Sequence, residues 1–471
     1  MLNIGDSERL TRWLIVLATL SFVPTLFFYL VGEEGTYIIT SMEMWHQHNW
    51  MQQLMYGADN GRPPLVNWLT MPLSALLGWS HVIFAVRLVS VLATLGTVVW
   101  LYWLCRRLYA DKAFALFAAL TALSLADWLL YRGWLSYTDP VFAFFTFGAM
   151  ATLWVGVTEQ RRSWLLMSIL LVSCGLLTKA FTAYIFYGTV GFVLLLWQRD
   201  TRRFIFSPQS LFVFSLALVV PFIWFASIPH GGNSTGMLNE ITRKLSAQDA
   251  GAYLMHLIEF PLEVTMRLSP AILLALYLLL RKLVAEAETA PAHFQVALWV
   301  AILGFLPYWL SPQSSIRYLL PIYPLIALVC ARIIWRAGDP ARRLALRWFA
   351  AAIAIKFAFA LVLFPWYQTH YRGENYEQAA HTIMQRTQGF PLYVTDVRSV
   401  GIAITGYVDI ARFPQAPLTF PPAEFGSGFV LSMEADAKMG EIAETYTLAA
   451  DKIYLLCRGA ACVKRAGDNV P

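Results

Sequence analysis

Two adjacent acidic residues at the end of the first apolar segment are the first candidates for chemistry in this chain. Glu33 and Glu34 directly follow Trp13–Val31, an uncharged run about as long as a helix needs to cross the hydrocarbon core of a bilayer. Carboxylates at such a position are costly unless they are solvated or engaged by a partner. We therefore expect the pair to lie at a membrane boundary, where it could act on a substrate held in the membrane.

Other charged residues fall at the same expected boundary. They are Arg62 before two prolines, Arg132 and Asp139 in a short loop, Lys179 in a tight hairpin, and Arg317 with Tyr318 at the start of an apolar segment. Carboxylates and cations at one depth suit a phosphorylated amphiphile whose headgroup must be neutralised. Any single cation could instead be an interfacial anchor. Arg87 and Asp127, in or beside apolar runs, could pair with each other or with backbone carbonyls.

The composition indicates a membrane protein that crosses the bilayer many times. Of the 471 residues, 58% are hydrophobic and only 14% are charged, whereas soluble proteins average about 25% charged residues. The net charge of +6 arises from short basic clusters between apolar runs, which is typical of cytoplasmic loops rather than of a nucleic-acid-binding face. Because no small-residue cleavage site follows Trp13–Val31, we interpret this run as a retained helix and not as a signal peptide.

About eleven apolar segments are long enough to be interpreted as spans. They are Trp13–Val31, Leu88–Cys105, Ala113–Leu130, Pro140–Val157, Trp164–Thr178, Phe181–Trp197, Gln209–Ile228, Leu268–Leu280, Phe294–Leu310, Tyr318–Trp335 and Trp348–Trp366. The basic clusters share one side with the N-terminus, which places that side in the cytoplasm. An odd number of spans then puts the tail outside, where Cys457 and Cys462 are close enough to form a disulfide.

Three segments on the outer side are long enough to form structure of their own. Pro229–Arg267 opens with Gly-Gly-Asn-Ser-Thr-Gly, a flexible loop signal, and continues with helical periodicity. Residues 32–86 are amphipathic and rich in tryptophan, which favours helices lying in the interface plane. The pattern of the tail, residues 367–471, predicts a small α/β unit, with a helix at Tyr376–Arg386 and strands at 392–395, 429–431 and 452–456. The expected fold is therefore an α-helical polytopic membrane domain, residues 1–366, followed by a C-terminal α/β domain, residues 367–471.

The order of these motifs resembles the polyprenyl-phosphate-dependent glycosyltransferases of the GT-C type. The resemblance covers roughly Arg9 to Trp366 and is similar in kind to the aminoarabinose transferases of lipid A modification and the protein O-mannosyltransferases. It rests on the acidic pair, Tyr37, Ser41-Met42-Glu43-Met44, Asn49-Trp50, Arg62-Pro63-Pro64-Leu65 with Trp68, Thr138-Asp139, Leu177-Thr178-Lys179-Ala180 and Arg317-Tyr318-Leu319-Leu320-Pro321.

The resemblance implies an inverting transferase at the periplasmic face of a bacterial inner membrane. It would take a sugar from a polyprenyl (undecaprenyl) monophosphate and place it on a lipid, glycan or protein acceptor. Glu33 takes the place of the family's catalytic acid and Asp139 that of the second-loop aspartate. Substrate binding falls to Glu34, Tyr37, Arg62, Arg132, Lys179, Arg317 and Tyr318, with Lys179 expected near the carrier phosphate.

Two residues depart from the family pattern. Glu33 stands where the family has Asp, and Thr36 stands where relatives acting on lipid A carry an arginine. The general class stays the same, but neither the sugar nor the acceptor follows from the sequence.

Several alternatives stay open. A hydroxyl acceptor would need Glu33 or Asp139 as general base, whereas with a phosphate acceptor the acids would orient the sugar or bind a cation. A divalent cation is possible because three carboxylates share one interface. A flippase for lipid-linked sugars would need polar residues on broken helices near the midplane, where this chain is apolar. A surface-polysaccharide polymerase or ligase using a diphosphate carrier would share the same environment.

Overall fold

The computed structural model describes residues 4–179, 181–197, 201–228, 249–284, 286–395, 399–448 and 451–467. The chain divides into two compact units. The helical unit comprises Met1–Thr25, Ser90–Trp134 and Thr138–Phe359, and the mixed unit comprises Leu26–Val89, Leu135–Tyr137 and Ala360–Pro471. Each unit is therefore built from segments that are far apart in the sequence.

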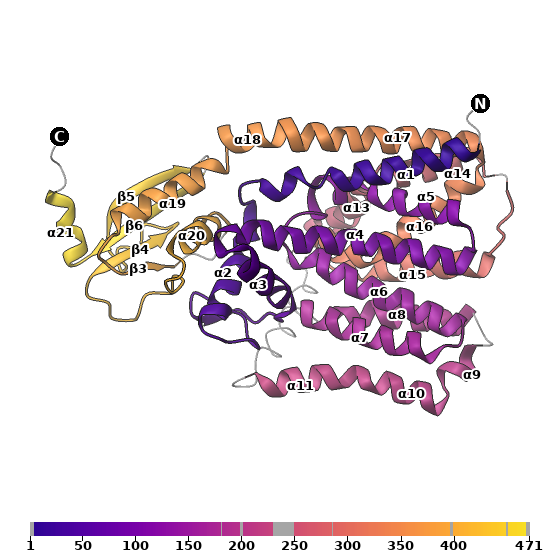
Figure 1. Ribbon diagram of the computed structural model, residues 1–471, viewed down its shortest axis with the longest axis horizontal. Coiled ribbons are helices and arrows are strands. Elements are labelled where there is room, and N and C mark those ends of the chain that lie inside the picture. The colour runs from indigo at the N-terminus through magenta and orange to yellow at the C-terminus, as the bar shows by residue number, and fades with distance from the viewer. Residues whose placement is uncertain are drawn as a thin grey trace. The chain divides into compact units, whose positions relative to one another are not determined.

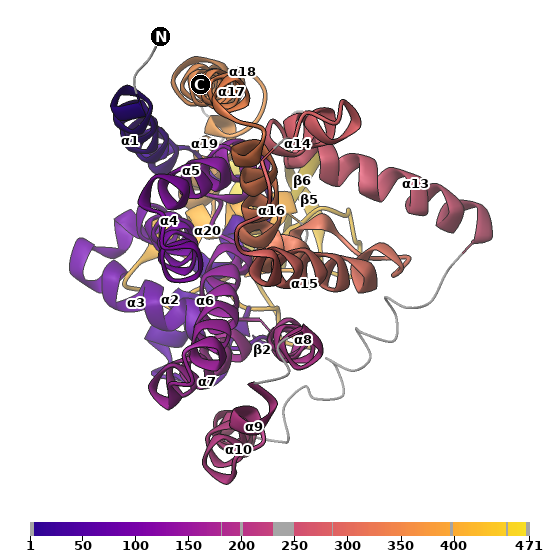
Figure 2. The same cartoon turned by 90° about the vertical axis from the view of Figure 1, so that its right-hand side faces the viewer.

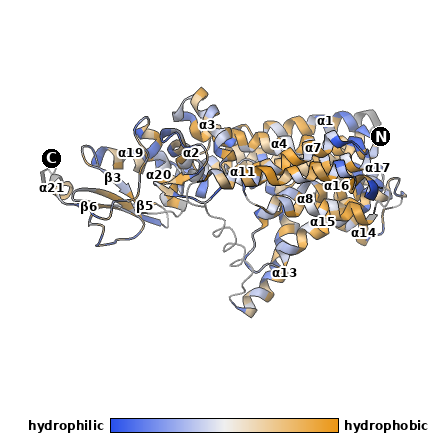
Figure 3. Cartoon of the chain, turned by 90° about the horizontal axis from the view of Figure 1, so that it is seen from below, coloured by the Kyte–Doolittle hydropathy of each residue, from blue (hydrophilic) through white to orange (hydrophobic). Residues whose placement is uncertain are grey.

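The helical unit is a bundle of apolar helices (Figure 1). Its helices are α1 (Ile4–Leu20), α4 (Val82–Tyr109, which begins in the mixed unit), α5 (Lys112–Leu123), α6 (Thr138–Thr158), α7 (Arg162–Thr178), α8 (Thr182–Trp197), α9 (Arg202–Ile205), α10 (Pro208–Ser215), α11 (Val219–Ser227), α13 (Ala250–Arg267), α14 (Ala271–Leu280), α15 (Pro291–Trp309), α16 (Tyr323–Arg336) and α17 (Asp339–Ala358). In Figure 3 the helices α4, α7, α11 and α15 are largely hydrophobic in colour.

The helices of this bundle pack against one another in pairs, and they differ in how much of their apolar surface the packing buries. α5 contacts α16, α16 contacts α15, α15 contacts α8, and α8 contacts α6, as the view in Figure 2 shows. α6 and the segment Ile316–Arg336 are mostly buried, whereas Pro208–Ser227 and Asp339–His370 leave most of their apolar surface exposed. A helix that is hydrophobic all round is expected in the middle of a bundle or against lipid, and both kinds are present here.

Within the described residues, seven helices are long and apolar enough to cross a membrane, or eight if the bent pair α13–α14 is one span. Each of the eleven expected segments contains helix, so the mostly helical fold is confirmed. However, α5, α7 and α8 are shorter apolar helices, and α13 and α14 meet at 106°. The first span also ends at Phe27 rather than Val31, at the end of the 3-10 turn Pro24–Phe27 that follows α1.

The mixed unit contains a four-stranded sheet in the order β3-β4-β6-β5. β3 is parallel to β4, and the other pairs are antiparallel, with Leu392 opposite Phe429 and Phe429 opposite Cys457. The strands are β3 (Leu392–Val394), β4 (Gly428–Ser432), β5 (Glu441–Leu448) and β6 (Asp451–Arg458), beside a small hairpin of β1 (Leu54–Met55) and β2 (Ala58–Asp59). Its helices are α2 (Gly35–His46), α3 (Leu65–Leu77), α18 (Phe364–His370), α19 (Glu374–Arg386), α20 (Ser399–Arg412) and α21 (Ala460–Gly467).

A single hydrophobic core joins the first outer segment to the C-terminal tail. Ile38, Ile39 and Met42 of α2 belong to the same buried cluster as Ile404 and Val408 of α20. The approach of α2 to α20 is so close that a Cβ at Gly35 would lie 2.5 Å from the Ile402 carbonyl oxygen. The mixed unit therefore draws on residues from both sides of the expected boundary at residue 366.

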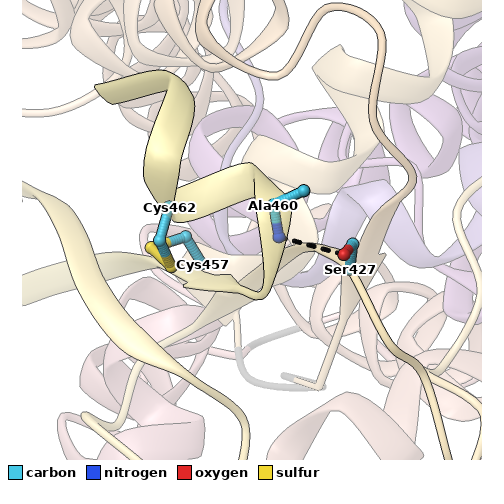
Figure 4. Close-up of a disulfide and its surroundings, with 4 residues drawn as sticks. All are labelled: Ser427, Cys457, Ala460 and Cys462. Carbon is cyan, nitrogen blue, oxygen red and sulfur yellow. Dashed lines mark hydrogen bonds between the residues drawn. A yellow bond between two sulfur atoms is a disulfide. The ribbon is translucent and has the colours of Figure 1, made fainter. Parts of the chain in front are cut away.

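A disulfide closes the C-terminal end of the sheet. Cys457 at the end of β6 is bonded to Cys462 in α21, with 5.2 Å between their Cα atoms. The turn between them is held by a hydrogen bond of 3.0 Å from the Ala460 amide to the Ser427 hydroxyl (Figure 4). These are the two cysteines whose spacing favoured pairing.

Candidate functional site

Glu34 is the centre of a buried ion pair in the mixed unit. It lies in the 3-10 turn Gly32–Glu34, and its carboxylate receives two bonds from Arg87 of α4, Nε to Oε1 at 2.9 Å and Nη2 to Oε2 at 2.5 Å. Neither side chain is exposed to solvent. Arg87 also donates to the carbonyl oxygens of Phe28 and Tyr29. A buried charge pair is tolerated when its remaining hydrogen-bonding groups are satisfied, and this condition is met here.

Three further donors complete the shell around Glu34. The Ser136 amide and hydroxyl lie 2.9 Å and 3.1 Å from Oε1, and the Val31 amide lies 2.8 Å from Oε2. The Glu34 carboxylate therefore links its own turn to α4 and to the segment Leu135–Tyr137. Of the two alternatives expected for Arg87, pairing with Asp127 is wrong, because Arg87 forms its ion pair with Glu34. The other alternative, hydrogen bonding to backbone carbonyls, is confirmed.

Glu33 has the opposite environment although it is the neighbouring residue. Its side chain is exposed and, within the described part of the chain, takes no part in a hydrogen bond or ion pair. Its amide lies 3.4 Å from the Tyr137 hydroxyl, and the turn that presents it depends on Gly32, which has φ +60°. Glu33 is thus the exposed carboxylate of the pair, whereas Glu34 is buried and paired.

Arg62 and Tyr37 of the mixed unit contact each other. Tyr37 is buried in the first turns of α2, and its hydroxyl accepts a hydrogen bond of 3.1 Å from Arg62 Nη1. The Arg62 side chain itself is exposed. Its guanidinium therefore combines a contact to the Tyr37 hydroxyl with exposure to solvent, and a guanidinium is a group suited to binding anions.

Asp139 and Lys179 form an ion pair in the helical unit. Asp139 lies in the first turn of α6, where a negative charge is favoured by the helix dipole. Lys179 follows the last residue of α7, and its ammonium binds Asp139 Oδ1. The same ammonium lies 4.5 Å from the centre of the Tyr318 ring, and the Arg317 guanidinium lies 5.4 Å from that ring. Four predicted site residues are therefore brought together.

Arg132 belongs to a different network in the same unit. Asp127 is buried and receives Arg132 Nη1 at 3.2 Å, Arg267 Nη1 at 2.8 Å and the Tyr323 hydroxyl at 2.8 Å. Arg132, expected to bind substrate, is thus tied to Asp127 within five residues of the chain. Arg267 and Tyr323 were not singled out in the sequence. Arg267 ends an amphipathic run and could have been noticed as a cation at a helix end.

The three carboxylates once considered for a divalent cation are engaged differently. Over the described ranges, no three His, Cys, Asp or Glu side chains gather in a way that could hold a metal ion. Glu34 is bound to Arg87 and Asp139 to Lys179. Cations of the protein itself therefore supply the positive charge beside two of the three acids.

Glu43, further along α2, is a buried acid outside the spans. Its Oε2 accepts a hydrogen bond of 3.1 Å from the Gly57 amide, and its Oε1 binds the Tyr56 amide. Burial raises the pKa of Glu43 to about 7, although the two amide donors act in the opposite direction. This residue belongs to the resemblance motif of the first outer loop, and its role here is to bind the β1–β2 turn.

Comparisons with known proteins agree with the resemblance. Residues 61–225 match the family model described as dolichyl-phosphate-mannose-protein mannosyltransferase. An undecaprenyl phosphate-alpha-4-amino-4-deoxy-L-arabinose arabinosyl transferase from Pseudomonas aeruginosa (strain UCBPP-PA14) is 28% identical over 318 residues, 65% of this chain and 56% of that protein. One of the same description, numbered 1, from Pseudomonas fluorescens (strain Pf0-1) is 26% identical over 440 residues, 88% of this chain and 71% of that protein.

The fold comparison extends over nearly the whole chain. The crystal structure of ArnT from Cupriavidus metallidurans bound to undecaprenyl phosphate matches with a TM-score of 0.70 and 17% identity, covering 97% of this chain and 99% of that one. The two share a fold. The chain spans only about a third to a half of the length of several of the curated relatives that it matches.

Proposed function

We propose that this chain, which belongs to the GT-C family of polyprenyl-phosphate glycosyltransferases, transfers a sugar from an undecaprenyl monophosphate carrier to an acceptor with inversion. The observation that carries the proposal is the contrast between Glu33 and Glu34. One carboxylate is exposed and uncommitted, while its neighbour is locked by Arg87. This arrangement suits a general base presented on a rigid support.

In the proposed reaction, an acceptor oxygen attacks the anomeric carbon of the sugar as the bond from that carbon to the carrier phosphate breaks. With a hydroxyl acceptor, its proton passes to Glu33, and the polyprenyl phosphate leaves as an anion. The cations proposed to stabilise the charge that develops on this leaving group are Arg62 of the mixed unit and Lys179 of the helical unit, each taken by itself. Within the helical unit, Asp139 holds the Lys179 ammonium, and the Tyr318 ring lies beside it. With a phosphate acceptor no base is needed, and Glu33 would orient the sugar.

The proposed topology follows the positive-inside rule. The N-terminus faces the cytoplasm, about eleven segments span the inner membrane, residues 1–366 form the transmembrane catalytic domain, and residues 367–471 lie in the periplasm. The other residues of the same proposal are Arg132 and Arg317 for substrate binding and Tyr37 as the partner of Arg62. The relatives' names make 4-amino-4-deoxy-L-arabinose the first sugar to test, and lipid, glycan and protein acceptors are all candidates.

The experiment uses the full-length protein in lipid nanodiscs with undecaprenyl phosphate-linked sugars and candidate acceptors. Release of undecaprenyl phosphate together with a gain of one sugar mass on an acceptor would support transfer. Movement of the intact donor between leaflets of proteoliposomes, without cleavage, would overturn the proposal in favour of a flippase. Mass spectrometry of envelope glycolipids and glycoproteins from cells with and without the protein identifies the natural acceptor.

A further inference from the structure

A network of buried amides lies behind Arg62. Gln53, Asn67, Thr40 and Ser41 are all fully buried in the mixed unit. Gln53 Nε2 donates to the Pro63 carbonyl oxygen at 3.0 Å and to Asn67 Oδ1 at 2.5 Å. Asn67 Nδ2 donates to Thr40 Oγ1 at 2.8 Å and to Ser41 Oγ at 2.9 Å. The network therefore links the start of α3 to the middle of α2.

The network has only one favourable orientation. Each of the two amide groups uses both of its N–H hydrogens, and Gln53 Oε1 accepts a hydrogen bond of 3.0 Å from Asn60 Nδ2. Thr40 passes its own hydrogen to the Thr36 carbonyl oxygen at 2.8 Å. Turning either amide over would place donors against donors or acceptors against acceptors. A buried network in which the Gln53 and Asn67 amides are both satisfied rigidifies the backbone around it.

The backbone that it holds is the one that carries Arg62. On one side, the Asn60 amide donates to the Gln53 carbonyl oxygen at 2.9 Å, in addition to the contact of its side chain. On the other side, the carbonyl oxygen of Pro63 is bound by Gln53 Nε2. Gln53 thus fastens the chain two residues before and one residue after Arg62. Gly61, with φ +64°, supplies the turn between these two anchors.

The Arg62 side chain needs such support because burial does not fix it. It is exposed, and it donates to the Tyr37 hydroxyl on α2, the helix that also carries Thr40 and Ser41. A long exposed side chain loses conformational freedom when it binds an anion. A backbone already anchored to the helix of its partner reduces that loss, and a displacement of about 1 Å at a positioned group can cost on the order of a hundredfold.

We propose that Gln53 is a positioning residue for the transferase, which acts by fixing Arg62 relative to Tyr37 for binding of the donor phosphate. This inference rests on the proposed function, because it takes the anion-binding role of Arg62 from there. Gln53 itself is buried and does not touch substrate. Its influence should therefore appear in donor affinity and should vanish once Arg62 is removed.

The test compares Gln53→Met, Arg62→Ala and the double variant in nanodiscs, with Thr387→Val as the control. Thr387 is a buried residue of the same unit, directly after α19, and within the described part of the chain its hydroxyl donates to the Ile383 carbonyl oxygen alone. We expect Gln53→Met to raise KM for the donor roughly tenfold to a hundredfold, with a smaller change in kcat. The double variant should be no worse than Arg62→Ala. Losses that multiply, or an unchanged KM in Gln53→Met, would overturn the proposal.

Two further measurements separate this inference from the proposed function. Hydrogen–deuterium exchange of residues 59–62 should become faster in Gln53→Met and not in Thr387→Val, whatever the activity. For Gln53→Glu, the ratio of its donor KM to that of the parent should be measured at pH 8 and at pH 6. The ratio should be lower at pH 6, because only the protonated carboxyl can donate a hydrogen bond to the Pro63 carbonyl oxygen. Absence of transfer by the parent protein would contradict the function alone, whereas unchanged exchange would contradict the role of Gln53.

Discussion

Glu34 and Arg87 form a two-point ion pair in which neither side chain reaches solvent, with distances of 2.9 Å and 2.5 Å. They are 53 residues apart in sequence. The pair explains why the two adjacent glutamates cannot serve the same purpose. Glu34 is fixed by Arg87, Ser136 and Val31, while Glu33 projects from the turn that Glu34 holds.

Replacing Glu33 by Gln should abolish most of the transfer without harming the fold. The amide cannot take a proton from an acceptor hydroxyl, and loss of a general base typically costs about a hundredfold to ten-thousandfold in rate. Because the side chain is exposed and unpaired in the described chain, the melting temperature should stay within a degree or two of the parent. Transfer at the parent rate by Glu33→Gln would remove this residue from catalysis.

Replacing Glu34 by Leu should instead destabilise the mixed unit. The change leaves the Arg87 guanidinium buried without its counter-charge, which typically costs about 3–5 kcal/mol. Thermal unfolding of the purified protein measures the effect. Combining Glu34→Leu with Arg87→Met should recover part of the lost stability because both charges are then absent. If the single variant melts like the parent, the ion pair does not stabilise the unit.

The ion pair between Asp139 and Lys179 predicts a binding defect. Lys179→Met removes the ammonium beside Tyr318 and should raise the apparent Kd for undecaprenyl phosphate by roughly tenfold, in keeping with about 1.5 kcal/mol for a charged hydrogen bond. Binding can be followed by native mass spectrometry in nanodiscs. Arg161→Ala, an exposed residue before α7 whose ion pair with Glu159 spans 3.7 Å, is the matched control and should leave binding unchanged. Equal Kd values in the two variants would exclude Lys179 from the phosphate site.

Local patterns were sufficient to predict much of this fold. The apolar runs are helical, and the runs around Leu392, Phe429 and Ile453 are strands, since each pattern is read over a few neighbouring residues. The helix α20 was not predicted, because Ser399–Arg412 is rich in β-branched residues and contains two glycines, and both lower helix propensity. The strand β5 was not predicted either. It is an exposed edge strand with charged residues, and it lacks the run of apolar residues that marks a buried strand.

Local patterns could not predict which residues distant in the sequence pair with each other. The acidic pair was recognisable as a candidate, yet its division into a locked Glu34 and a free Glu33 depends on Arg87 and Ser136, 53 and 102 residues away. The same holds for Arg132, which resembles a free interfacial cation in the sequence but is paired with Asp127. Charge and hydropathy place a residue at a depth, and only the packing of helices decides its partner.

Stability of the mixed unit should fall as the pH rises from about 5 to 9. Burial raises the pKa of Asp409 to about 8 and that of Glu43 to about 7, above their ordinary values near 4. The folded state therefore binds more protons than the unfolded state in this interval, and unfolding becomes more favourable with each step upward in pH.

Asp409→Asn should flatten this pH dependence. Its Oδ1 can still accept the hydrogen bond of 2.8 Å from the Leu418 amide, while no charge has to be buried at high pH. We expect a gain of about 1–3 kcal/mol at pH 9 and little change at pH 5. Thermal unfolding across this pH range measures both, with Glu424→Gln on the exposed surface as the control. A slope equal to that of the parent would contradict the assignment.

The disulfide predicts both the stability and the compartment of the C-terminal segment. Reducing the bond between Cys457 and Cys462 opens a loop closed over five residues, which should lower stability by about 2 kcal/mol. Reduced thiols in spheroplasts should react with a membrane-impermeant maleimide if the segment lies in the periplasm, as the proposed topology requires. Arg161→Cys, in a segment proposed to face the cytoplasm, is the control and should react only after lysis. Labelling of the control alone in intact spheroplasts would reverse the topology.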